Sequence, residues 1–222
     1  MLYPAQDGRE YVLNLIDTPG HVDFSFEVTK SLQACEGTIL VVDAAQGVEA
    51  QTVANYQLAK DRGLAILPLI NKVDLPNAQV ERTAEEIQHL LGSADARITL
   101  ASAKEGKGVP ELLERIIQEV PPPAGDPSAP LSCLVFDSVY DSYKGVVVFV
   151  RLFEGTLRRG LPITLMSNSL RFEVQEVGVF KPQPEPVQEL QAGEVGYLTA
   201  NIRNPHDVMA GDTVTETEHP TP

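Results

Sequence analysis

A short apolar run ends abruptly in residues that could hold a metal ion and a phosphate. Residues 12–16 are apolar except for Asn14, and Asp-Thr-Pro-Gly-His follows at 17–21. In open α/β sheets, ligands bind just beyond the carboxyl ends of the strands, so Asp17 is expected to face a site. A carboxylate there can hold a hydrated Mg²⁺, and a glycine lets its N–H approach a phosphate oxygen. An ordinary strand-to-turn exit, where Asp and Gly are common, is the alternative interpretation.

Two further polar groups follow apolar runs in the same way. Asn-Lys-Val-Asp stands at 71–74 and Ser-Ala-Lys at 102–104. Guanine presents an N–H and an exocyclic amine side by side, and one carboxylate, that of Asp74, can accept both hydrogen bonds. Adenine lacks this pair of donors, so the contact would discriminate between the two bases. Asn71 can bind the base edge and tie neighbouring loops together, and the stem of Lys72 can lie against the flat base.

The elements that must position these groups alternate between strands and helices. Alternation with strands too apolar to be exposed predicts a parallel sheet covered on both faces. Right-handed crossovers put the carboxyl ends of such strands on one edge, so the three polar groups are expected to converge. Asp7-Gly8 predicts a turn between a short strand at 1–5 and the next apolar run. Buried strands are predicted at 11–16, 38–42, 65–70 and 98–101, and helices at 23–34, 51–62, 80–91 and 109–117.

The pattern changes after residue 120. Five prolines and a glycine within 119–130 predict a stiff, extended linker. Beyond it, apolar residues recur with period two between Gly, Pro, Asn and Asp turns, which predicts an antiparallel barrel. We therefore expect an α/β domain at 1–120, a linker at 121–130 and a barrel at 131–217. The predicted strands of the barrel are 131–136, 146–153, 163–166, 172–177 and 195–199.

Net charge, cysteine spacing and the length of the apolar runs indicate which kinds of protein this chain could be. The net charge of −14 over 222 residues argues against broad binding to nucleic-acid backbone, although a local basic face stays compatible with it. Cys35 and Cys133 stand among apolar neighbours without metal-binding spacing, which favours buried thiols. No apolar run approaches the roughly 18 residues of a membrane span, and the N-terminus lacks the order of a signal peptide. A soluble, intracellular protein is expected.

Together the three polar groups resemble the GTP-binding motifs of translational GTPases, and the chain is similar to the elongation factor 4 (LepA) family. That resemblance implies a partial GTP-binding (G) domain with the parallel sheet of P-loop GTPases, followed by the β-barrel called domain II in translation factors. It rests on IDTPGHVDFSFEV (16–28), PLINKVDLPNA (68–78), ASAKEGKGV (101–109) and FDSVYDSYKGVVVFVRLFEGTLRRG (136–160).

The resemblance also implies roles for individual residues. Asp17 would hold Mg²⁺ through water, and His21 is the implied catalytic residue, which orients the attacking water. A solvated turn histidine is the alternative for His21. The Ala103 N–H would meet the guanine oxygen, and Lys104 would pack on the base opposite Lys72. The whole implied set for GTP or GDP is Asp17, Thr18, Pro19, Gly20, His21, Asn71, Lys72, Asp74, Ser102, Ala103 and Lys104.

The chain departs from the family in several parts. It contains no GxxxxGK[ST] sequence, so the amides and the lysine that cradle the phosphates are missing. The first switch is absent or reduced to residues 1–5, and the later domains, including the one that reaches toward tRNA, are missing. We therefore expect an internal segment of such a protein. In the family, a strand lies between those at 11–16 and 38–43, so these two should either pair directly or leave open edges.

The implied function is GTP hydrolysis on the ribosome during translation elongation. Because hydrolysis depends on positioning and charge neutralisation at the phosphates, this chain alone is expected not to turn over GTP. The alternatives are a non-catalytic module that docks on small-subunit rRNA through the barrel, or a truncated fragment without independent function. The family further implies a cytoplasmic monomer, peripheral on the inner membrane in some members or mitochondrial if organellar. Candidate rRNA contacts are Arg151, Arg158, Arg159 and Arg171.

Overall fold

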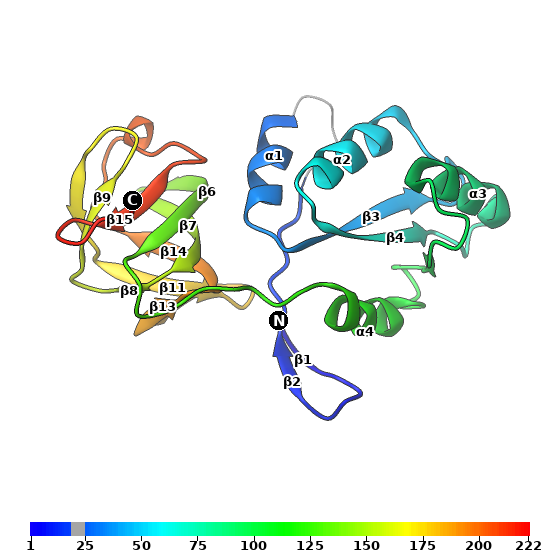
Figure 1. Cartoon of the computed structure of the whole chain (residues 1–222), viewed down its shortest axis with the longest axis horizontal. Helices are drawn as coiled ribbons and strands as arrows, with labels where there is room; N and C mark the ends of the chain where they lie inside the picture. The colour runs from blue at the N-terminus through cyan, green and yellow to red at the C-terminus, as the bar shows by residue number, and fades with distance from the viewer. Residues whose placement is uncertain (19–24) are drawn as a thin grey trace. The chain divides into compact units, whose positions relative to one another are not determined.

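A computed structural model of the chain describes residues 1–18 and 25–222 (Figure 1). It divides into two compact units, one of Leu2–Pro122 and one of Pro123–Pro222 together with Met1. Each unit has its own buried core. None of the helices in these two ranges has the length and apolar character that crossing a bilayer requires.

The first unit is built on a parallel sheet with the strand order β3-β4-β5. Pairing of the first two strands runs from Gly37 opposite Ala65 to Asp43 opposite Asn71. The predicted parallel α/β sheet is thus confirmed. The strands are β3 (Gly37–Asp43), β4 (Ala65–Asn71) and β5 (Thr99–Leu100), and the helices are α1 (Ser25–Gln33), α2 (Ala50–Asp61), α3 (Val80–Leu91) and α4 (Val109–Glu119).

Helices cover the two faces of this sheet differently. Successive side chains of a strand point to opposite faces. On one face Val42 and Ile70 pack against Ile87 of α3, while α1 and α2 cover the start of the strands. Helix α4 lies on the other side, as Figure 1 shows. There Leu69 of β4 is buried, whereas Val41 beside it on β3 is 54% exposed. The outer strand β3 is therefore left uncovered on this face near its carboxyl end.

The buried strand predicted at 11–16 is wrong. Its first residues form β2 (Glu10–Val12), which pairs with β1 (Leu2–Pro4) in the hairpin expected from Asp7-Gly8. Glu114 of α4 holds this hairpin by accepting hydrogen bonds from the Tyr3 hydroxyl and the Gln6 N–H, at 2.8 and 3.0 Å.

An apolar strand is buried only where neighbouring strands cover it, and residues 13–18 form none in the structure. Val12 and Leu15 are accordingly 67% and 80% exposed. Because the family strand between them is missing, the segments at 11–16 and 38–43 were expected either to pair directly or to leave open edges. The described residues show an open edge, since β3 pairs with β4 alone.

Arg115 fastens α4 to the sheet. Its side chain is 2% exposed, donates to the Thr99 hydroxyl at 2.7 Å, and pairs with Glu119 at 2.8 Å. Since Thr99 leads directly into the loop at 102–104, this contact also fixes the start of that loop.

Replacing Arg115 by alanine is expected to lower the free energy of unfolding of the first unit by about 2 kcal/mol, because it removes buried packing and leaves the Thr99 hydroxyl without its donor. Urea unfolding measures this change. Arg97→Ala serves as the control, since exposed Arg97 also pairs with Glu119. A cost below about 0.5 kcal/mol for Arg115→Ala would show that the contact does not stabilise the unit.

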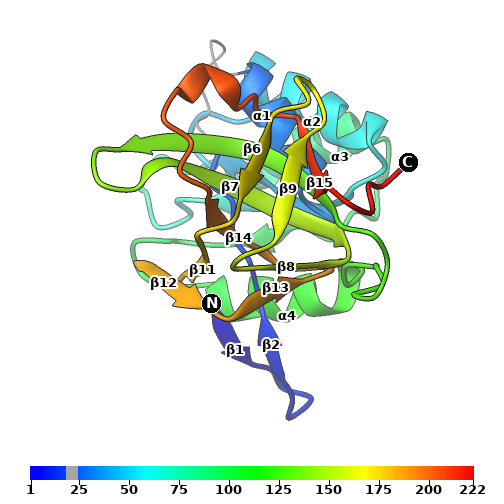
Figure 2. The same ribbon diagram turned by 90° about the vertical axis from the view of Figure 1, so that its left-hand side faces the viewer.

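The second unit consists of antiparallel strands around one core, as predicted. Its main sheet has the order β10-β9-β15-β6-β7-β14-β11-β12, and β8 pairs with β13. Figure 2 shows the long β6–β7 hairpin from the side. The strands are β6 (Ser132–Asp141), β7 (Gly145–Glu154), β8 (Thr156–Arg158), β9 (Pro162–Leu165), β10 (Arg171–Glu173), β11 (Glu176–Phe180), β12 (Pro184–Val187), β13 (Glu189–Gln191), β14 (Val195–Thr199) and β15 (Thr213–Glu216), with a 3₁₀ turn η2 (Pro205–Asp207).

The proline-rich linker forms hydrogen bonds with the second unit before β6 begins. Asp126 N donates to Glu154 Oε2 at 2.5 Å, and its carbonyl accepts from Gly155 N at 2.9 Å. Cys133 is buried in the core as predicted, and burial raises the pKa of its thiol. Cys35 in the first unit is partly exposed, contrary to the prediction.

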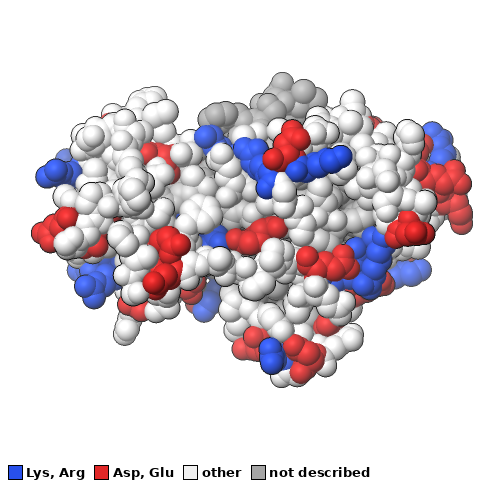
Figure 3. All heavy atoms as spheres, in the orientation of Figure 1, with Lys and Arg blue, Asp and Glu red and all other residues white. Residues whose placement is uncertain are grey.

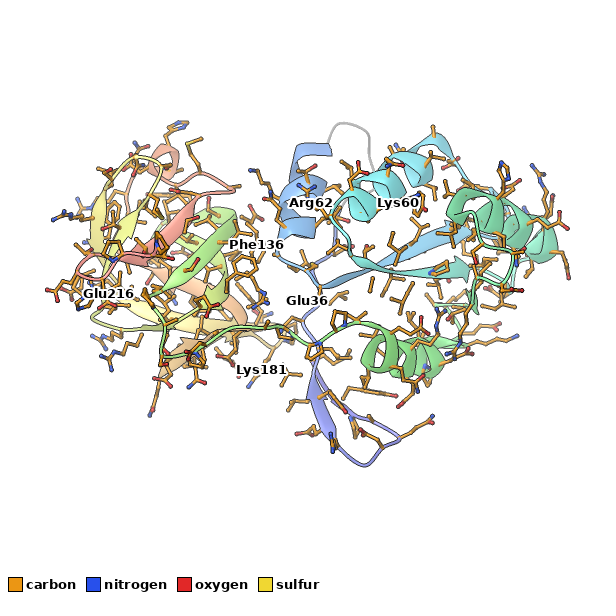
Figure 4. All side chains as sticks on the ribbon, viewed as in Figure 1. Glu36, Lys60, Arg62, Phe136, Lys181 and Glu216 are labelled. Atoms are coloured by element: carbon orange, nitrogen blue, oxygen red, sulfur yellow. The ribbon has the colours of Figure 1, made fainter. Side chains whose placement is uncertain are left out.

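Aromatic side chains lie on the outer face of this sheet, because they alternate with the core residues along their strands. Phe149 contacts Phe136 and Phe180 at ring-centroid distances of 6.2 and 5.2 Å. The ring of Tyr197 covers Gly178, where an added Cβ would collide with it. Figure 4 labels Phe136 on β6. A glycine at 178 therefore lets an aromatic layer lie flat on the sheet.

Candidate functional site

The loops that follow β4 and β5 are joined through one asparagine. Asn71 ends β4, and its side-chain Oδ1 accepts a hydrogen bond from Ala103 N at 3.0 Å. Its backbone carbonyl accepts from Ala44 N at 2.9 Å, which ties in the loop after β3. Val73 N donates to the Ala101 carbonyl at 3.2 Å. The structure thus brings residues 71–74 and 102–104 together at the carboxyl edge of the sheet.

Ser102 links the two loops a second time, through Asp74. A hydrogen bond from the Ser102 side chain lowers the pKa of Asp74, with a smaller contribution from the charge of Lys104 and some opposition from burial. The Ser102 side chain is fully buried, and its backbone pairs in both directions with Lys107, at 3.0 and 3.1 Å. The Asp74 carboxylate is therefore kept ionised beside a loop that these backbone hydrogen bonds order.

Lys72 adopts an unusual backbone conformation between these anchors. Its φ of 64° lies in the left-handed region, which is uncommon for a residue other than glycine. Its ammonium lies 2.7 Å from a carboxylate oxygen of Asp43, the last residue of β3. Asp43 is not among the site residues predicted from the sequence. Its position at the carboxyl end of the neighbouring strand was the signal that could have found it.

The phosphate end of the predicted site is not assembled in the same way. Pro19, Gly20 and His21 lie outside the described residues. Asp17 is exposed and Thr18 is half-buried, and both belong to the irregular segment after β2 rather than to a strand of the sheet.

Residues 1–18 and 25–222 contain no preformed cluster of metal-binding side chains. No group of three or more His, Cys, Asp or Glu side chains there could hold a metal ion. Mg²⁺ normally uses one or two carboxylates together with substrate phosphates. Asp17 would supply one such carboxylate, with the remaining ligands coming from the nucleotide and water, and no chemical step is assigned to the metal.

One of the four arginines predicted as rRNA contacts is placed wrongly for that role. Arg151 is 1% exposed, donates to the Leu152 carbonyl at 2.6 Å and lies 5.2 Å from the Phe153 ring centre. It is buried although it alternates with the core residues Val150 and Leu152 along β7, and so lies on the outer face of that strand beside Phe153. Arg158, Arg159 and Arg171 are exposed. In the view of Figure 3, basic side chains form small groups with acidic ones beside them.

Comparison with protein families accounts for both units. The family model described as elongation factor Tu GTP binding domain matches residues 4–122, and that of elongation factor Tu domain 2 matches residues 145–215. In fold, the chain is similar to the crystal structure of translation elongation factor SelB from Methanococcus maripaludis in complex with the GTP analogue GppNHp. That match has a TM-score of 0.75 at 23% identity and covers 91% of this chain and 46% of the other.

Curated relatives give the same assignment. The chain is 56% identical over 220 residues to elongation factor 4 of Geobacillus thermodenitrificans and 55% identical over 218 residues to that of Bacillus subtilis. These alignments cover 99% and 98% of the chain but only 36% of each relative, so the chain spans about a third of their length. Since the GTP-binding family model covers more than half of the chain, the chain belongs to the translational GTPase family of the elongation factor Tu GTP-binding domain, and within that family it is similar to elongation factor 4.

Proposed function

We propose that the first unit binds the guanine base of GTP or GDP, as the base-recognition part of a translational GTPase of the elongation factor 4 type. The observation that carries this proposal is the hydrogen bond from Ala103 N to Asn71 Oδ1, which joins the two loops predicted to contact the base. The pKa of neighbouring Asp74 is lowered mainly by the Ser102 side chain, so an ionised carboxylate is present at the same edge of the sheet.

Each group has a distinct task in this proposal. The Asp74 carboxylate accepts the two adjacent N–H groups of guanine. The stems of Lys72 and Lys104 enclose the flat base, because long aliphatic chains can cover apolar surface while their charged ends stay in water. In the structure Ala103 N already donates to Asn71, so the guanine oxygen would share that donor or replace the asparagine oxygen.

We infer GTP hydrolysis for complete translational GTPases of this type and not for this chain by itself. The chain has no GxxxxGK[ST] sequence to neutralise the phosphates, and positioning at the phosphates supplies most of the catalysis in such enzymes. Orientation of water by His21 and Mg²⁺ binding by Asp17 remain predictions from the resemblance.

Calorimetric titration with GDP, guanosine and ADP tests the proposal. Because only the base is recognised, we expect GDP and guanosine to bind within about threefold of each other, with or without Mg²⁺. ADP should not bind, and no GTP should be hydrolysed. Equal binding of ADP would contradict base recognition, and turnover of GTP that is lost in Asp17→Ala would contradict the limit placed on this chain.

Guanosine binding should depend on pH in a way that the Asp74 environment dictates. The lowered pKa of Asp74 keeps its carboxylate ionised below the ordinary aspartate range. A depressed pKa means that the ionised form is complete above the ordinary value and is lost only as the pH falls through the lowered one. The affinity for guanosine should therefore be constant from about pH 7 to pH 5 and fall only below about pH 4. A decline already between pH 7 and pH 5 would show that another group controls binding.

A second proposal concerns the barrel. Arg158 at the end of β8 and the adjacent Arg159 are both exposed, and they are suited to contacts with phosphates of small-subunit rRNA. Co-sedimentation with small ribosomal subunits should weaken with added salt and be lost in Arg158→Glu/Arg159→Glu, while Lys181→Glu should leave it intact. No binding of the wild-type chain at low salt would refute this proposal.

A further inference from the structure

The carboxylate of Asp43 holds a lysine of the candidate base site. Asp43 lies directly opposite Asn71 in the parallel register, one residue before Lys72. The Oδ2 atom of Asp43 lies 2.7 Å from Lys72 Nζ. The Asp43 side chain is only 15% exposed, whereas that of Lys72 is 56% exposed. A half-exposed lysine would otherwise sample many rotamers, and ordering it would cost free energy when a ligand binds.

The carboxylate is itself fixed by the turn that follows β3. Its Oδ1 atom accepts a hydrogen bond from Ala45 N at 2.7 Å. The Asp43 carbonyl accepts from Gln46 N and Gly47 N, at 3.2 and 2.9 Å. The position of Oδ2 is thus set by backbone groups that do not depend on the lysine.

The backbone fixes the other end of the same side chain. Lys72 has a φ of 64°, and residues in this region persist only where surrounding structure holds them. Here the Asn71 carbonyl accepts from Ala44 N at 2.9 Å, and the Lys72 carbonyl accepts from Leu75 N at 3.2 Å. These bonds hold the Cα of Lys72, and Asp43 holds its ammonium. The aliphatic stem between these two points is therefore fixed in one conformation.

We propose that Asp43 is a positioning residue for guanine recognition: by anchoring the Lys72 ammonium, it sets the stem of Lys72 as one wall of the base site before any ligand arrives. This inference rests on the proposed function. Asp43 does not itself contact the base in this arrangement, and its influence passes entirely through Lys72.

The ion pair can be tested first in the ligand-free chain. Titration of the lysine ¹³Cε signals by NMR should give Lys72 a pKa above that of ordinary lysines, because the Asp43 carboxylate stabilises its charged form. In Asp43→Asn the Lys72 pKa should return toward the ordinary value. Asparagine retains an oxygen that can accept from Ala45 N, so the turn is kept. An identical Lys72 pKa in the two proteins would overturn the proposal.

A double-mutant cycle on guanosine binding then separates positioning from a structural role. Asp43→Asn should weaken guanosine binding by about three- to tenfold, the range expected for ordering one long side chain. In the Lys72→Ala background the same substitution should have no further effect. Lys181→Ala, which removes a barrel lysine of similar exposure from its ion pair with Glu185, should leave binding unchanged. Equal weakening by Asp43→Asn with and without Lys72 would overturn the proposal in favour of a role in the turn.

Failure of the proposed function gives a different result. If the folded wild-type chain binds no guanosine at all, guanine recognition by this unit is refuted whatever the Lys72 pKa. A raised Lys72 pKa in that case would show an ion pair with no base to position, and the positioning role would be overturned with it.

Discussion

Replacing Asp74 by alanine is expected to weaken guanosine binding at least thirtyfold, which is about 2 kcal/mol at room temperature. The carboxylate would accept two hydrogen bonds from guanine, and hydrogen bonds to charged groups contribute roughly 1.5–3 kcal/mol each. The Ser102 side chain lowers the pKa of this carboxylate, so the acceptor is fully ionised in the free chain at neutral pH. Calorimetry with guanosine on the two proteins measures the loss.

Two further variants make this test specific. Asp74→Asn keeps the size of the side chain but offers one acceptor oxygen beside an amide that donates, so it should lose binding as fully as Asp74→Ala. Asp95→Ala removes an exposed carboxylate from the loop before β5 and should bind as the wild type does. Unchanged binding in Asp74→Asn would mean that the charge and the pair of acceptors are not what recognises the base.

Replacing Gly108 by alanine is expected to have the largest effect on stability, about 3 kcal/mol for the first unit. Gly108 precedes α4 with a φ of 76°, a left-handed conformation that costs other residues roughly 1–2 kcal/mol. An added Cβ would also collide with the backbone carbonyl oxygen of Leu100 at the end of β5. Because backbone cannot turn aside as a side chain can, the loop at 102–107 must move, and guanosine binding should weaken with it.

Gly106 provides the matched control for this prediction. It lies in the same loop with a φ of 73°, but a Cβ there would meet nothing within 4 Å. Gly106→Ala should therefore cost about 1 kcal/mol, from the backbone conformation alone. Urea unfolding followed through the amide signals of β4 compares the two. Equal costs would show that contact with Leu100 does not constrain the loop.

Much of the first unit could be predicted because its signals are long and clearly bounded. The apolar runs that became β3 and β4 each span most of a seven-residue strand. Helix α3 has the bounds predicted, 80–91, and Gly92 ends it in a left-handed conformation. The run at 11–16 carries the same local signal, yet its burial depends on neighbouring strands, which a local pattern does not contain.

The second unit was predicted in class but not in detail. Strands such as β8 and β13 span three residues each, too few to display an alternating pattern. A single strand predicted at 172–177 is two in the structure, β10 and β11, because the chain leaves the ladder at Val174 and Gln175. Short strands of this kind are defined by their partners rather than by their own composition.

The candidate site could likewise be predicted where it depends on local sequence motifs, but not where it depends on contacts between distant residues. The order of the motifs and the edge rule for parallel strands were enough to predict that residues 71–74 and 102–104 meet. The ion pair between Asp43 and Lys72 needs the register of two strands to be known, because it places Asp43 opposite Asn71. The burial of Arg151 could not be predicted either, because it depends on what covers the outer face of β7 rather than on the alternation along the strand.

The most direct test of a guanine site in this chain is an NMR titration of the ¹⁵N-labelled protein with guanosine, using adenosine as the comparison. The amides of residues 71–74 and 102–104 should shift in a saturable manner with guanosine, Ala103 most clearly, since its N–H would exchange Asn71 for the base oxygen. Adenosine should leave them unchanged. A folded chain whose signals in these two loops respond to neither nucleoside, or to both alike, would contradict the site.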